Sequence, residues 1–413
     1  MPFPRIRRRR LLLFLSIMGP GIITASVDQD AGGIATYSLA GAHYGTSLLW
    51  SLFFIAISLA VVQEMGSRMG VVTGKGLAEL IREAYGIRFT AAVLAVLVLA
   101  NWANTVANFA GVAAALEIFG VPRLLSVPAV AGLVGWLIIK GTYRRVERVF
   151  LLASAGYLVY VISGFLARPA WGEVLLATVT PTFRLQPDYL TMLIALVGTT
   201  IAPWMQFYLQ SSVVDKGIRV KEYPFARLDV FLGSLAAAVI AFFIIVACAV
   251  TLHVHGVRIE TAADAALALE PFAGRYATIL FAVGLFNAST FAAAIVPLST
   301  AYAACEALGW ASGVDRGLQE APGFFAIFLA LVGTGAAAIL WPGAPLIEIM
   351  VASQVLNGIL LPAVLLLMLR LINDREVMGT HVNSPLFNLI AWSTAGIMIA
   401  LSVLLLILTL RGV

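Results

Sequence analysis

Long apolar runs separated by short polar connections are the feature that most restricts how this chain can fold. Only 11% of its 413 residues are charged, whereas a typical soluble domain has about 25%. A membrane-spanning helix needs about 20 mostly apolar residues. We therefore predict an all-α integral membrane protein with eleven transmembrane helices. These lie near residues 11–40, 45–65, 89–119, 124–140, 149–167, 189–213, 226–253, 276–305, 322–341, 345–370 and 386–410.

Basic residues set the expected orientation of these helices. Arginines at positions 5 and 7–10 precede the first apolar run. A signal peptide also begins this way, but this run exceeds a cleaved core, so residues 1–10 are interpreted as a basic cytoplasmic segment before a retained helix. If the loops alternate sides, all but six of the 26 Lys and Arg residues share the side of the N-terminus. This asymmetry predicts a multi-pass inner-membrane protein with its N-terminus inside and its C-terminus outside.

The remaining composition excludes several classes of protein. The net charge of +5 follows from the loop asymmetry, so the bilayer is an expected partner and nucleic acid is not. The loops are too short for a soluble domain, and no nucleophile–base pair suggests an enzyme. Cys248 and Cys305 lie within predicted spans, where packing is favoured over a disulfide or a metal pair.

Two predicted spans are interrupted by helix-weakening residues. The first contains residues 19–33, with Gly32 and Gly33, and the sixth contains residues 198–206, with Pro203. The interruptions are five spans apart, which is typical of a transporter built from inverted repeats. We expect a first five-helix repeat over 11–167, a second over 189–370, and an additional eleventh helix over 386–410.

Two carboxylates lie within the first interruption, at Asp28 and Asp30. A charge at the bilayer centre costs roughly 2.5–3.5 kcal/mol, so such acids indicate a functional site. On an intact helix the two would point to nearly opposite faces, and only local unwinding would bring both into one cavity. Gln354 in the tenth span is a candidate partner. For the asparagine stripe of the third span, Asn101, Asn104 and Asn108, interhelical hydrogen bonding is the favoured interpretation.

Several motifs resemble those of the Nramp divalent-metal transporters. Residues 68–79 resemble the loop after the second span of that family. Residues 353–362 resemble its tenth span, and residues 374–379 resemble the following loop. Residues 19–21 and 41–45 fit as well. The resemblance implies a LeuT-like fold with broken helices 1 and 6 and a role in metal import.

The sequence departs from the Nramp pattern at the ligand positions. The resemblance implies that Asp30 is a metal ligand and that the carbonyl of Thr199 coordinates the ion. The family's asparagine ligand is replaced by Gly33, its methionine by Ala202 and its histidine by Trp204. These changes resemble those in the Nramp-related magnesium transporters.

The proton-transfer acids of the third Nramp span are also replaced. Their positions fall near Thr105 and Asn108, neither of which titrates near neutral pH. Uptake is therefore expected to be driven by the membrane potential without a coupled proton.

The expected substrate follows from the chemistry of the remaining ligands. Mg²⁺ takes oxygen ligands and keeps several waters, whereas a methionine sulfur favours softer ions. We predict a secondary transporter that imports Mg²⁺, and also Mn²⁺, as largely hydrated ions. The predicted ligands are Asp30, Asp28, the Thr199 carbonyl and Gln354. Gly33 and Ala202 would open volume for waters, with Trp204 as a wall.

Three alternatives remain open from the sequence. One is an ordinary proton-coupled importer of Mn²⁺ or Fe²⁺. Another is a LeuT-like transporter of a small organic solute, which broken helices alone would permit. The third is a membrane enzyme or a non-transporting membrane sensor.

Overall fold

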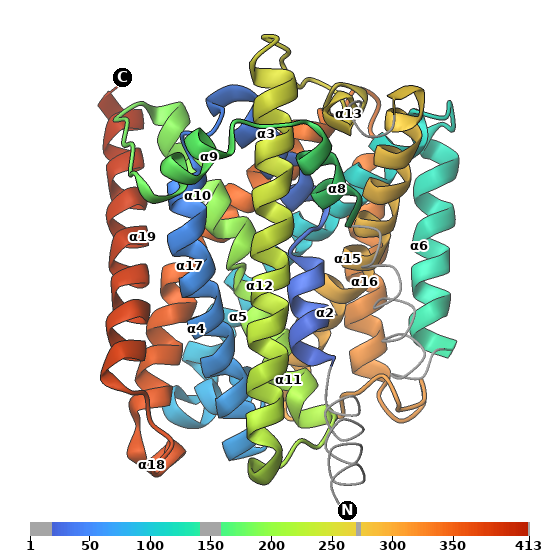
Figure 1. Ribbon diagram of the computed structural model, residues 1–413. Helices are drawn as coiled ribbons and strands as arrows, with labels where there is room; N and C mark the ends of the chain where they lie inside the picture. The colour runs from blue at the N-terminus through green and yellow to red at the C-terminus, as the bar shows by residue number, and fades with distance from the viewer. Residues whose placement is uncertain (1–18, 141–157, 270–273, 412–413) are drawn as a thin grey trace, which may run out of the picture.

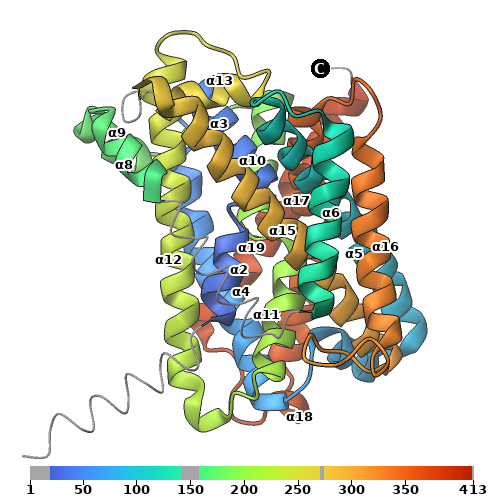
Figure 2. The ribbon, with the colours of Figure 1, turned by 90° about the vertical axis from the view of Figure 1, so that its right-hand side faces the viewer.

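The computed structural model describes residues 19–140, 158–269 and 274–411, and this part of the chain is a helical bundle (Figures 1 and 2). The helices of the first half are α2 (Pro20–Val27), α3 (Ala31–Tyr44), α4 (Leu49–Thr73), α5 (Leu77–Glu117), α6 (Arg123–Lys140), α8 (Leu158–Leu166) and α9 (Trp171–Val179). Those of the second half are α10 (Pro187–Thr200), α11 (Pro203–Asp215), α12 (Tyr223–Cys248), α13 (Ala262–Ala266), α15 (Ala277–Leu308), α16 (Pro322–Ile339), α17 (Leu346–Asn373), α18 (Arg375–Met378) and α19 (Pro385–Arg411).

The predicted spans agree with these helices. Within the described ranges, nine helical segments are long and apolar enough to cross a membrane. The predicted first span is the pair α2 and α3, two half-helices that are each too short to cross alone. Helix α8 covers the described part of the predicted fifth span, and residues 141–157 lie outside the described part, as does the N-terminal segment 1–10.

The second and third spans are longer than the sequence predicted. Helix α4 continues to Thr73 and α5 begins at Leu77, so residues 68–79 are mostly helical, and the expectation of a loop there is wrong. Gly74 ends α4 in the left-handed conformation (φ 66°, ψ 18°). Gly86 (φ 79°, ψ 167°) kinks α5, which separates a first short segment from the spanning part. Both glycines adopt backbone angles that residues with a Cβ avoid.

The two ends of the bundle carry different connections. Figure 1 shows α18 and the connection between α11 and α12 at the lower end, and α9, α13 and the last turn of α19 at the upper end. The lower connection contains Lys216, Arg219 and Lys221. Large apolar side chains are exposed on the sides of the bundle, for example Trp136 (62% exposed) and Leu389 (65% exposed), which is the surface expected of helices surrounded by lipid.

Small residues allow α17 and α5 to approach the two broken spans closely. A Cβ on Gly198 of α10 would lie 2.0 Å from the carbonyl oxygen of Gln354 on α17. A Cβ on Gly111 of α5 would lie 2.4 Å from the Cβ of Ala31 on α3. Side chains of α5 and α17 therefore reach the break between α2 and α3.

Candidate metal site

Asp30 begins the second half of the broken first span. Its backbone is extended (φ −69°, ψ −176°), and its Oδ1 accepts a hydrogen bond from the amide of Gly33 at 2.7 Å, as a helix N-cap does. Its Oδ2 accepts a hydrogen bond from Nδ2 of Asn108 at 3.2 Å. Nε2 of Gln354 lies 3.5 Å from Oδ1. Side chains from α3, α5 and α17 therefore meet at this carboxylate.

Asn108 connects α5 to the start of α3. Its Oδ1 accepts a hydrogen bond from the amide of Ala31 at 3.2 Å, and its Nδ2 also donates to the carbonyl of Asn104 at 2.9 Å. Interhelical bonding describes Asn101, whose Nδ2 donates to Oγ1 of Thr300 on α15 at 2.7 Å. Asn108 goes beyond that interpretation, since it contacts the carboxylate predicted to bind metal.

Gln354 lies at the centre of a polar network on α17. Its Nε2 is 3.3 Å from Oδ1 of Asn104, and its Oε1 accepts a hydrogen bond from Nδ2 of Asn357 at 3.0 Å. In this arrangement the amide nitrogen faces Asp30. A rotation of the amide group would turn Oε1 toward a cation held by Asp30, as the predicted ligand role requires.

Asp28 ends the first half of the span and has its own partners. Its Oδ2 accepts hydrogen bonds from Nε2 of Gln29 at 3.1 Å and from the hydroxyl of Tyr37 at 3.4 Å. The Tyr37 hydroxyl also lies 2.7 Å from Oγ1 of Thr200 at the end of α10. Within the described residues, Oδ1 of Asp28 is buried without a hydrogen-bond partner. Tyr37 therefore links the two broken spans, and Asp28 keeps one oxygen available.

The break in the sixth span leaves the Thr199 carbonyl without its usual helical partner. Helix α10 ends at Thr200, and the backbone leaves the helical region at Ile201 (φ −126°, ψ 58°). The residue four positions after Thr199 is Pro203, which has no N–H to donate. Oγ1 of Thr199 also lacks a hydrogen-bond partner among the described residues.

Gly33 does not open volume in this structure, contrary to the expectation from the sequence. A Cβ at Gly33 would lie 2.3 Å from the carbonyl oxygen of Asp28 and 3.2 Å from Oγ1 of Thr199. The unwound segment folds back over this glycine and fills the space that a side chain would need. Gly33 instead brings the carbonyl of Asp28, the hydroxyl of Thr199 and the N-cap of Asp30 together.

Ala202 and Trp204 flank the break in the sixth span. Ala202 is the N-cap residue of α11, and its side chain is buried. The indole ring of Trp204 is buried with its centroid 6.3 Å from that of Tyr208, and its carbonyl accepts a hydrogen bond from the Ser299 hydroxyl at 2.9 Å. These contacts are those of a packed residue, consistent with a wall.

The site combines two buried acids with neutral oxygen and amide groups. The exposed fraction is 3% or less for Asp28, Asp30, Thr199 and Gln354, so the site is closed to both sides. Asp28 and Asp30 are two residues apart in the unwound segment, and none of the ion pairs among the described residues involves either of them. Two carboxylates without a basic partner favour a bound cation.

Two further observations describe the ligand chemistry. Within the described residues, no three His, Cys, Asp or Glu side chains cluster as a ready metal cage. Buried oxygens without a hydrogen-bond partner surround the break, however, including Oε1 of Gln29 and Oδ1 of Asn357. Such atoms usually indicate water or an ion, so a cation here would be held by few carboxylates and by several neutral oxygens.

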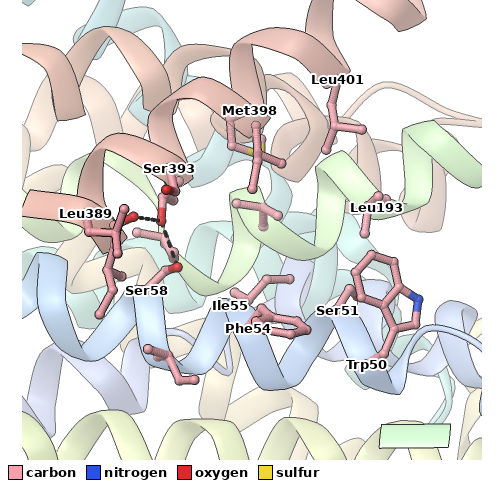
Figure 3. A pocket seen from close by; sticks show the side chains of 16 residues that line it. Trp50, Ser51, Phe54, Ile55, Ser58, Leu193, Leu389, Ser393, Met398 and Leu401 are labelled. Atoms are coloured by element: carbon pink, nitrogen blue, oxygen red, sulfur yellow. Dashed lines mark hydrogen bonds between the residues drawn. The ribbon is translucent and has the colours of Figure 1, made fainter. Parts of the chain in front are cut away.

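A separate hollow lies beside the site rather than in it. It has a volume of about 560 Å³ and lies between α4, α10 and α19 (Figure 3). Its lining is largely apolar, and the Ser58 hydroxyl is bonded to Thr394 at 2.8 Å. Its lining residues include none of the predicted ligands, and it reaches the sixth span at Val197 and Ile201.

Sequence reasoning missed one member of the site. Tyr37 is not among the residues predicted from the sequence, although it contacts Asp28 and Thr200. Asn104 makes the interhelical hydrogen bond predicted for the asparagine stripe, and its partner is Gln354 on α17. A polar side chain on the predicted first span, nine residues from an intramembrane acid, was the available signal for Tyr37.

Comparison with known proteins connects this geometry to one family. The family described as "Natural resistance-associated macrophage protein-like" (Nramp) matches residues 21–408. A divalent metal cation transporter MntH from Ralstonia nicotianae is 30% identical over 403 residues, which cover 92% of this chain and 87% of that protein.

Solved structures show the same fold. A manganese transporter from Eremococcus coleocola, crystallised with an aromatic bis-isothiourea compound, superimposes with a TM-score of 0.73 at 21% identity, covering 96% of this chain and 86% of that chain. Mhp1, a nucleobase-cation-symport-1 family transporter, superimposes with a TM-score of 0.59 at 17% identity, covering 94% and 92%. The predicted LeuT-like fold is thus confirmed.

Proposed function

Because the chain belongs to the Nramp family, we propose that it is a secondary transporter that imports divalent metal ions across the membrane, with Mg²⁺ and Mn²⁺ as substrates. Asp30 is the principal ligand, Asp28 is the second carboxylate, and the carbonyl of Thr199 and the amide oxygen of Gln354 complete the set. The observation that carries the proposal is the pair of buried carboxylates at the break of the first span, without a basic partner among the described ion pairs.

The chemistry of the site supports hard cations. Carboxylate, carbonyl and amide oxygens suit Mg²⁺ and Mn²⁺, and a thioether would favour softer metals. Ala202 and Trp204 supply no such sulfur at the break of the sixth span. Relatives named as divalent metal cation transporters and a manganese transporter of the same fold favour Mn²⁺ as a second substrate.

Part of the hydration shell travels with the ion in this proposal. Mg²⁺ gives up water reluctantly and is usually held by one or two carboxylates. Buried oxygens of Asp28, Thr199 and Asn357 have no hydrogen-bond partner among the described residues. They would accept hydrogen bonds from waters on the metal, so that few direct ligands suffice.

Replacing the principal ligand tests the assignment. Asp30→Asn keeps a side chain that can cap α3 but removes the charge, and Asp30→Ala removes both. Each should lower Mg²⁺ and Mn²⁺ flux into liposomes by more than about 100-fold, since loss of an outer-shell partner alone typically lowers metal affinity 10–100-fold. Asp28→Ala should cause a smaller loss.

The control is Asp215→Asn, which alters an acid at the end of α11 that accepts a hydrogen bond from Tyr302 and lies away from both breaks. This variant should retain flux. Wild-type flux in a folded, monodisperse Asp30→Asn protein would refute the site assignment. Flux of an organic solute but of neither metal would favour the alternative transporter class.

A further inference from the structure

The closed site requires part of the protein to move during transport. All four proposed ligands are at most 3% exposed, so an ion can neither reach nor leave them in this arrangement. Helix α2 is the element best suited to move, because it has eight residues and ends at the unwound segment 28–30. Figures 1 and 2 both show α2 alongside α12.

Helix α2 is held to α12 by a buried carboxylate. Oδ1 of Asp229 accepts a hydrogen bond from the amide of Gly19 at 3.2 Å, and Oδ2 accepts one from the amide of Gly21 at 2.7 Å. Asp229 is 1% exposed. The first amides of a helix lack partners within it and carry partial positive charge. No side chain of the N-cap residue supplies the missing partner, so Asp229 caps α2 from another helix.

The backbones of α2 and α12 also touch at two glycines. A Cβ on Gly21 would lie 2.8 Å from the nitrogen of Val230, and a Cβ on Gly233 would lie 2.6 Å from the carbonyl oxygen of Gly21. Gly19 has φ 149° and ψ −60°, angles that residues with a side chain rarely adopt. The contact therefore depends on this backbone geometry and on the carboxylate together.

We propose that Asp229 is a positioning residue that holds α2 against α12 in the closed state, and that breaking this contact opens the metal site toward the end of the bundle at which α2 begins. The inference rests on the proposed function for its role in transport. The contact itself is independent of which ion is carried. Hydrogen bonds to a charged acceptor are stronger than neutral ones, so the carboxylate favours the closed arrangement. Opening requires the loss of these two bonds together with the glycine contacts.

Thiol labelling of α2 without metal tests the contact directly. The reporter is Ala25→Cys, a buried position on α2, in a protein with Cys248 and Cys305 replaced by alanine. The probe is a water-soluble maleimide added to purified protein. Asp229→Asn should increase the labelling rate about tenfold or more, since hydrogen bonds to a charged acceptor are stronger than those to a neutral one.

Two controls distinguish loss of the Asp229 contact with α2 from a general destabilisation of the protein. Ala40→Cys reports a buried position on α3, beyond the break, and its labelling rate should not change with Asp229→Asn. Asp215→Asn should leave the labelling of Ala25→Cys unchanged. Equal acceleration at both reporter cysteines, or no acceleration at Ala25→Cys, would overturn the proposal.

A second variant keeps the test decisive if Asp229→Asn does not fold. Gly233→Ala leaves the carboxylate in place but puts a methyl group against the Gly21 carbonyl, and it should also accelerate labelling of Ala25→Cys. No acceleration in folded Gly233→Ala would then overturn the proposal. In flux assays, loss of the Asp229 contact should raise the KM for Mn²⁺ more than it lowers the maximal rate, because the closed state, in which all four ligands surround the ion, is less populated. Lost flux with normal labelling in Asp30→Asn would show that the two proposals stand separately.

Discussion

At the scale of single residues, the site depends on which carboxylate and carbonyl oxygens take part in helix capping and hydrogen bonds, and which do not. One oxygen of Asp30 caps α3 and the other accepts a hydrogen bond from Asn108, so the carboxylate is held in place before an ion arrives. Asp28 keeps one oxygen that has no hydrogen-bond partner in the described part of the chain. Gly33 matters because its missing side chain admits the Asp28 carbonyl. An asparagine at position 33 would therefore displace the unwound segment as well as add a ligand.

The selectivity of the site can be tested at Ala202 alone. Ala202→Met adds a thioether at the break of the sixth span without disturbing Gly33. Sulfur favours softer ions over Mg²⁺, so we expect the preference for Mn²⁺ over Mg²⁺ to rise about tenfold, which corresponds to about 1.4 kcal/mol. Competition between the two ions in liposome flux measures this ratio, and Ala202→Leu controls for side-chain volume. An equal change in the leucine variant would contradict the argument from sulfur.

At the scale of helices, proline and the end of α10 free the Thr199 carbonyl from its usual place in a helix, as the proposed ligand role requires. Pro203 cannot donate to the carbonyl of Thr199, and α11 starts anew after Ala202. In the first span an acid marks the corresponding new helix start, since Asp30 is the N-cap of α3. Unwound backbone is tolerated at membrane depth where protein surrounds it. The many buried polar groups at the two breaks satisfy this condition.

Restoring the missing backbone donor should weaken the site. Pro203→Ala provides an N–H that can bond to the Thr199 carbonyl and continue α10 toward α11. We expect metal affinity to fall about tenfold, within the range found for changes near metal ligands, while the protein remains folded. Isothermal titration with Mn²⁺ measures the affinity, and Pro187→Ala, at the first position of α10, is the matched control. An unchanged affinity would mean that the Thr199 carbonyl is not a ligand.

At the scale of the whole molecule, the bundle places both breaks at one closed, electrically unbalanced site. In the proposed function two carboxylates would bind a divalent ion there, and the side chains that contact them are amides and hydroxyls, from Asn108, Gln354, Tyr37 and Gln29. The positions near Thr105, Asn108 and Trp204 carry no group that titrates near neutral pH. A proton relay leading away from the site would need other residues.

Metal uptake should therefore be driven by voltage without a coupled proton. A divalent ion gains roughly 4.6 kcal/mol across 100 mV, twice the value for one charge. We expect uptake into liposomes to increase with an inside-negative potassium potential, with no acidification of the lumen. At saturating metal, uptake should vary little between about pH 6 and 8. At low metal concentrations it should fall as the pH falls, because protons compete for the carboxylates.

A trapped pH-sensitive dye distinguishes this mechanism from proton symport. Acidification in proportion to Mg²⁺ or Mn²⁺ uptake, abolished when metal is omitted, would contradict the uncoupled mechanism and support the proton-coupled alternative. Asp30→Asn liposomes provide the baseline for both signals.

The sequence by itself determined the membrane class, the number of spans and the positions of both breaks. These features are local: apolar length sets the spans, and glycine, proline and buried acids mark where helices cannot continue. Asp30 could be assigned for the same reason, because a carboxylate at membrane depth is costly and is seldom kept without a function. The ends of α4 and α5 were less predictable, since polar and charged residues can extend a helix beyond the apolar stretch.

Only the tertiary structure decided which groups meet. The contact of Asn108 with Asp30 depends on how α5 approaches α3, and that of Tyr37 with Asp28 depends on the unwound segment between α2 and α3. The space at Gly33 was filled by a carbonyl of its own span, which no spacing rule predicts. Asp229 and Gly21 are 208 residues apart in the chain. Such contacts follow from packing of the whole bundle, because a side chain's partner is set by the helices around it and not by its neighbours in sequence.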